Sequence, residues 1–139
     1  MHHDRYTFGT RVEATPELVR ESVEVALRAE GFGVLTEIDV AATMRAKLGV
    51  ERDPYLILGA CNPQLAHRAI TADPAVGALL PCNVVIRADG TGTIIEAMDP
   101  QAALGLIDLA DVAAVGAEAR EKLLRVVAAV EAQFGASPA

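Results

Sequence analysis

The sequence predicts a mixed α+β domain in which helices pack on one face of a mostly antiparallel sheet. Short segments typical of strands are interleaved with longer segments in which apolar residues recur at helical spacing. Four helix starts are indicated by a capping residue followed by proline, at Thr15, Asn62, Asp73 and Asp99. Two late strands flank a turn at residues 89–92, which predicts a hairpin.

The first half of the chain alternates strand and helix. Residues 6–12 alternate and contain Tyr, Phe, Thr and Val, so they are predicted as a strand. Residues 16–30 are predicted as an amphipathic helix, because apolar and charged side chains separate onto opposite faces. We expect its inward face to comprise Leu18, Val19, Val23, Ala26 and Leu27. A second strand at 32–38 and a short helix at 40–48 follow.

The second half begins with the continuous apolar segment 55–61, which predicts a strand buried on both faces or nearly so. Asn62 then starts a helix that continues to about residue 72, and a short turn or helix follows Asp73. The remaining elements are predicted as two hairpin strands at 83–88 and 93–98 and two helices at 100–109 and 112–134. The last helix has a broad apolar stripe, because its apolar residues repeat at intervals of three and four.

The 139 residues are expected to form one domain, with its core at 6–134 and a frayed tail at 135–139. The helices are too few to cover both faces of the sheet. We expect Ile57, Val85 and Ile95 on the uncovered face. An uncovered apolar sheet face usually packs against a second copy of the chain, so we expect a homodimer.

The composition excludes several classes of partner. There are 19 acidic and 12 basic residues, a formal net charge of −7, which opposes binding to the phosphates of nucleic acid. Aromatic residues are only 4% of the chain, too few for a base-stacking surface. No apolar run reaches the roughly 18 residues of a membrane helix, and the first residues lack the apolar part of a signal peptide. We therefore expect a cytoplasmic protein that binds neither nucleic acid nor membranes.

Cys61 and Cys82 are the strongest candidates for a functional site. Cys61 ends one predicted strand and Cys82 immediately precedes the next, so antiparallel pairing would place both at one end of the sheet. They would then lie within range of a disulfide or a shared metal ion. Each is followed by asparagine, Asn62 and Asn83. Cys61 also precedes a helix N-terminus, which lowers a thiol pKa.

Several interpretations of these residues stay open. The cysteines could act in redox or sulfur chemistry or bind Cu(I) or Zn, or they could be two small buried hydrophobic residues. His67 could be a third ligand or a general base, or a solvated helix histidine. Glu37 and Glu96 could pair as general acid and base, or occupy exposed strand positions.

Four segments resemble a known family, the domain of unknown function family number 302. They are GFGVLTEIDV at 31–40, YLILGACNP at 55–63, LLPCNVV at 79–85 and EAMDP at 96–100. The resemblance covers nearly the whole chain and implies a fold related to the TATA-box-binding protein, usually as a homodimer. The resemblance does not carry DNA binding over to this chain, because a shared fold is not a shared function and the net charge opposes DNA binding. Both cysteines lie within these segments, but the resemblance does not assign them a role.

Taken together, these features predict a cytoplasmic homodimeric binding or interaction module rather than an enzyme. Its small-ligand site is expected near Cys61 and Cys82, where the helix starts at Asn62 and Asp99 could receive a small anionic or polar ligand. A soft metal ion on the two cysteines is a further expectation. The alternative is a thiol-based redox, sulfur-transfer or copper-handling protein that uses the same pair.

Overall fold

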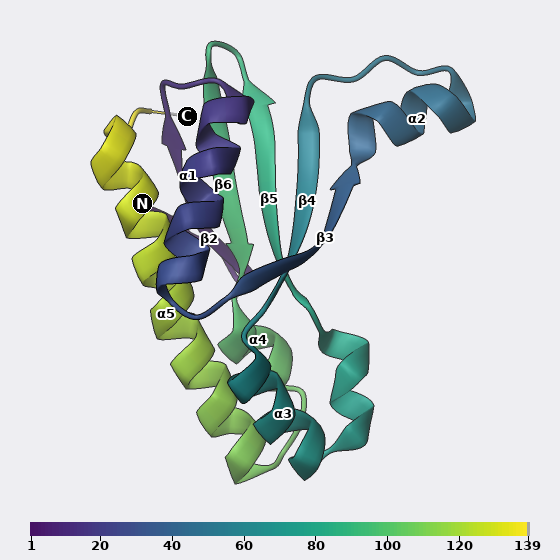
Figure 1. Ribbon diagram of the computed structural model, residues 1–139, viewed down its shortest axis with the longest axis vertical. Helices are drawn as coiled ribbons and strands as arrows, with labels where there is room; N and C mark the ends of the chain where they lie inside the picture. Colours follow the sequence, from purple (N-terminus) through teal and green to yellow (C-terminus); the bar gives the residue numbers. More distant parts are fainter. Residues whose placement is uncertain (139) are drawn as a thin grey trace.

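The computed structural model describes residues 1–138 and confirms the mixed α+β class (Figure 1). The strands are β1 (His2–His3), β2 (Thr7–Val12), β3 (Gly33–Asp39), β4 (Tyr55–Cys61), β5 (Cys82–Asp89) and β6 (Gly92–Met98). The helices are α1 (Pro16–Ala29), α2 (Val40–Leu48), α3 (Pro63–Ala72), α4 (Pro100–Leu104), α5 (Ala110–Phe134) and the 3-10 helix η1 (Pro74–Leu79). The strands form one antiparallel sheet in the order β1-β2-β6-β5-β4-β3.

Helices α1 and α5 cover one face of this sheet, and the main hydrophobic core lies between them and the strands (Figure 1). Leu58, Ile86 and Ile95 from the central strands are fully buried there. The predicted inward face of α1 is correct for Val19, Val23, Ala26 and Leu27. The prediction for Leu18 is wrong. The buried stripe runs through residues 19, 22, 23, 26 and 27 and leaves Leu18 outside it, 53% exposed.

The opposite face of the sheet carries no helix among the described residues. Ile57 and Val85 are Cα partners on this face, as expected. Ile95 is not on it, because the β5–β6 register pairs Ile95 with Ile86 and places Glu96 beside Val85. A strand alternates its side chains between faces, so this register directs Ile95 into the core.

Helices α3 and α4 lie beyond one end of the sheet, beside α5 (Figure 1), and a second hydrophobic cluster forms there. It joins α3, η1, α4 and the first half of α5 through buried residues that include Leu65, Ala69, Val76, Leu104 and Val115. Helix α5 contributes to both clusters, because its predicted apolar stripe is buried along most of its length. Helix α4 stops at Leu104, short of the predicted residue 109.

The C-terminal segment is attached to the sheet where a frayed tail was expected. Ala136 forms an isolated bridge with Val12, and the Ser137 amide donates to the Arg11 carbonyl at 2.7 Å. The Arg11 guanidinium also donates to the Ser137 hydroxyl at 2.8 Å. The last residue of the predicted tail, Ala139, lies outside the described residues. Within residues 1–138, every helix is too short or too polar to cross a membrane.

Candidate functional site

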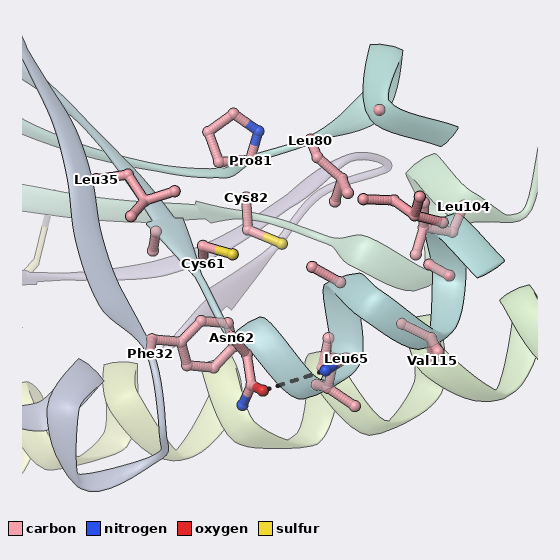
Figure 2. A pocket seen from close by; sticks show the side chains of 16 residues that line it. Phe32, Leu35, Cys61, Asn62, Leu65, Leu80, Pro81, Cys82, Leu104 and Val115 are labelled. Carbon is pink, nitrogen blue, oxygen red and sulfur yellow. Dashed lines mark hydrogen bonds between the residues drawn. The ribbon is translucent and has the colours of Figure 1, made fainter. Parts of the chain in front are cut away.

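A cavity of about 270 Å³ lies where the end of the sheet meets the second hydrophobic cluster (Figure 2). The ends of β4 and β5 form one wall and α3 forms another, with α4 and α5 closing the far end. Apart from Cys61, Asn62 and Cys82, the lining side chains are apolar. They include Phe32, Leu35, Leu65, Ala66, Ala69, Ile70, Leu80, Leu104 and Val115.

Cys61 and Cys82 both line this cavity, and Figure 2 shows their sulfur atoms pointing into it. Cys82 is the Cα partner of Ala60 across the β4–β5 ladder, which places the two cysteines at the same end of the sheet. The predicted placement is therefore confirmed. Both cysteines are free thiols; Cys61 is half-buried and Cys82 is buried.

Burial raises the pKa of the Cys82 thiol to about 11, and the nearby Cys61 adds to the increase. An apolar environment disfavours the charged thiolate, so Cys82 stays protonated at neutral pH. Because the thiolate is the nucleophile and the metal ligand, Cys82 is a poor nucleophile in this state. The surroundings of this cysteine suit packing against an uncharged ligand.

Asn62 joins β4 to α3 and fixes the start of that helix. Its side-chain oxygen accepts a hydrogen bond from the Leu65 amide at 3.3 Å, the expected N-cap bond. Its side-chain amide donates to the Glu30 carbonyl at 3.4 Å. Gly31 has φ +83° and lies so close that a Cβ there would be 3.1 Å from the Asn62 nitrogen. Asn62 therefore positions the cavity wall, with both ends of its amide already bonded.

The other predicted site residues lie away from the cavity. His67 is exposed on the outer side of α3, beside Arg68 and Thr71. Asn83 is exposed on the uncovered sheet face, because the residue after an inward-facing Cys82 must face outward. Asp99 caps α4 and accepts a hydrogen bond from the Arg120 guanidinium at 3.2 Å. Within residues 1–138 no three His, Cys, Asp or Glu side chains are grouped to hold a metal ion.

Glu37 and Glu96 do not form the acid–base pair that was one interpretation of the sequence. Glu37 accepts a hydrogen bond from the Arg20 guanidinium at 2.6 Å, on the face that carries α1. Glu96 is on the opposite face and accepts from the Arg87 guanidinium at 2.8 Å. The sheet separates the two carboxylates, which makes this interpretation wrong.

Comparison with known proteins identifies the family. Residues 8–130 match the family model described as "Domain of unknown function DUF302". The chain belongs to the DUF302 family. A solved structure, the uncharacterized conserved protein DUF302 from Bacillus stearothermophilus, is 27% identical and has a TM-score of 0.84. The likeness covers 90% of this chain and 98% of that one. No curated protein matches. These descriptions name no activity, so the function of this DUF302 chain has to be argued from its site.

Sequence reasoning missed the apolar walls of the DUF302 cavity, because Phe32, Leu104 and Val115 resemble ordinary core residues. One local feature bears on Leu35: the β3–β4 register shifts between Val34 and Thr36. Such a bulge redirects a side chain out of the strand alternation. Leu35 lines the cavity and is still 67% exposed. An irregular pairing of this kind cannot be read from hydrophobic periodicity alone.

Proposed function

We propose that this protein is a binding module that holds a small ligand in the cavity beside Cys61 and Cys82. The supporting observation is a cavity of about 270 Å³ with a mostly apolar lining. Small-molecule sites are typically concave and apolar with a few polar groups, and range from roughly 300 to 1,000 Å³. The present cavity lies just below that range, which favours a small ligand.

The chemistry of the lining supports binding over catalysis. Among the described residues it offers two thiols and the amide of Asn62, with no carboxylate or imidazole. General acid–base chemistry needs a titratable group within hydrogen-bond reach of the substrate. Cys82, with its pKa raised to about 11, does not meet this need near neutral pH.

A homodimer is the second part of the proposal. Ile57 and Val85 lie side by side on the sheet face that no described helix covers, and Ile38 pairs with Ile57 on the neighbouring strand. A second copy would remove this apolar strip from water.

Light scattering tests the homodimer and is expected to give twice the chain mass. Ile57→Asp should give a monomer, and the control Val25→Asp, on the outer side of α1, should not. A monomeric parent would refute this part.

The free thiols support a cytoplasmic location for this module. Neighbouring cysteines tend to be oxidised in extracellular compartments and stay reduced in the cytoplasm. Cys61 and Cys82 are both unbonded.

A thiol-based function is the alternative, supported by the two sulfur atoms that face one cavity. Two thiolates suit Cu(I), and metal binding would have to displace the Cys82 proton. Titration with Cu(I) in the presence of a competing chelator tests this. Tight binding of one ion, lost in both Cys61→Ser and Cys82→Ser, would favour the alternative over the apolar-ligand module.

Toluene, a small neutral apolar probe, tests the proposed module directly. Amide resonances of α3 and the ends of β4 and β5 should shift on titration, with saturation at one molecule per chain. Ala66→Phe puts a ring at the cavity wall and should abolish these shifts. Ala113→Phe, on the exposed side of α5, is the matched control and should bind like the parent. Shifts that persist in Ala66→Phe would contradict the proposal.

A further inference from the structure

The interior of the cavity offers a ligand no charged side chain and few hydrogen-bonding groups. Asn62 is the one amide side chain in the described lining, and its oxygen and nitrogen are bonded to the Leu65 amide and the Glu30 carbonyl. Throughout residues 1–138, no buried side-chain nitrogen or oxygen lacks a hydrogen-bond partner. A polar or charged group placed inside would lose its water and gain at most a weak hydrogen bond to a thiol, which is costly. The part of the ligand inside the cavity is therefore apolar.

The volume limits the size of that apolar part. An apolar cavity of about 150 Å³ holds one benzene molecule. By proportion, the present cavity of about 270 Å³ has room for about ten carbon atoms. This is too little for a sterol or a long fatty acyl chain and suits a medium-length chain.

The arrangement of the lining favours an extended shape. In Figure 2 the side chains run from Phe32 and Leu35 on one side to Leu104 and Val115 on the other, with both sulfur atoms between them. Leu35 is 67% exposed and Ile70 is 43% exposed, so the cavity wall reaches solvent through apolar side chains. A chain end that emerges there reaches water after passing only apolar contacts.

We infer that the ligand is a single unbranched aliphatic chain of about ten carbons, held inside the cavity with its polar end in water. This inference rests on the proposed binding function and specifies its ligand class. The apolar wall recognises the chain, and the identity of the polar end matters little because no described lining group bonds to it. The raised pKa of Cys82, to about 11, is consistent with an interior that excludes charge.

Calorimetric titration with a series of linear alcohols, from hexanol to dodecanol, tests the chain. The dissociation constant should fall about four-fold for each added methylene, and level off near ten carbons. Octanoate should bind within a few-fold of octanol, because the head group stays in water. Affinity that is independent of chain length, or a requirement for the carboxylate, would overturn the inference.

Toluene and two surface variants separate this inference from the proposed function. If toluene saturates the cavity while chain length has no effect, the ligand class is wrong and the binding module stands. If neither binds, both fail. Ile70→Ser changes an exposed residue of the lining, where a folding defect is not expected, and should weaken octanol binding several-fold. Val25→Ser, at an exposed position remote from the cavity, should bind like the parent, and equal affinities for all three proteins would overturn the inference.

Discussion

Cys61 and Cys82 point into the same apolar cavity from the ends of two hydrogen-bonded strands, β4 and β5, yet differ in burial. Cys61 is half-buried, whereas Cys82 is buried and its pKa is raised to about 11. The inner thiol is therefore held in its neutral form by the same apolar walls that would hold a ligand. This relationship links the chemistry of the cysteines to the binding proposal.

The two thiols should react with alkylating agents at very different rates. Only the thiolate reacts, so at about pH 8 a thiol with a pKa near 11 is about a thousandth ionised. We expect iodoacetamide to modify Cys61 first and Cys82 at least ten-fold more slowly, as measured by peptide mass spectrometry. In guanidinium the two rates should converge. Equal rates in the folded protein would contradict the buried, neutral state of Cys82.

The raised pKa of Cys82 also predicts a loss of stability at alkaline pH. Between the ordinary thiol pKa of 9.0 and the folded value of about 11, the unfolded chain loses this proton and the folded chain keeps it. The stabilisation is therefore complete below about pH 9 and is lost as pH rises through about 11. Two pKa units correspond to about 2–3 kcal/mol as an upper limit. Urea unfolding should show this loss for the parent relative to Cys82→Ala; parallel pH curves for the two proteins would exclude it.

Asn62→Ala should lower the free energy of unfolding by roughly 0.5–2 kcal/mol, the usual effect of losing an N-cap. The alanine cannot accept from the Leu65 amide or donate to the Glu30 carbonyl. Asn83→Ala is the matched control, because Asn83 is exposed on the uncovered face. Denaturant midpoints give the comparison, and a midpoint for Asn62→Ala equal to that of the control would argue against the cap.

Gly9→Ala should be strongly destabilising, although it adds only a methyl group. A Cβ at Gly9 would lie 2.0 Å from the Ile95 carbonyl oxygen on the paired strand β6. Overpacking against a fixed backbone costs about 1–3 kcal/mol or more. Gly33→Ala in β3 is the control, since no atom lies within 4 Å of its added Cβ. A thermal melt of Gly9→Ala that matches Gly33→Ala would show that β2 and β6 can separate.

The helix starts were predictable because their determinants are local. Thr15, Asn62, Asp73 and Asp99 each accept a backbone hydrogen bond within the first turn that follows, as capping residues do. The position of Ile95 was not predictable in the same way. Its face depends on the β5–β6 register, which is a relationship between strands, and the segment around it is apolar on both sides.

The site was predictable only in part. The ends of β4 and β5 bring Cys61 and Cys82 together, and this followed from the order of strands and turns. His67 lies outside the cavity because it is on the exposed side of α3. Asp99 also lies outside it, at the N-cap of α4. The apolar lining itself depends on how the second hydrophobic cluster packs against the sheet. No residue spacing in the sequence encodes the cavity that this packing leaves.

Methyl-resolved NMR under xenon pressure probes the apolar cavity itself, because xenon enters apolar cavities without needing a polar partner. We expect shifts at the methyl groups that line the cavity, those of Leu35, Leu65, Ile70, Leu104 and Val115. These shifts should be absent in Ala66→Phe. Unchanged cavity methyls, or shifts confined to Ile57 and Val85 on the uncovered sheet face, would contradict this expectation.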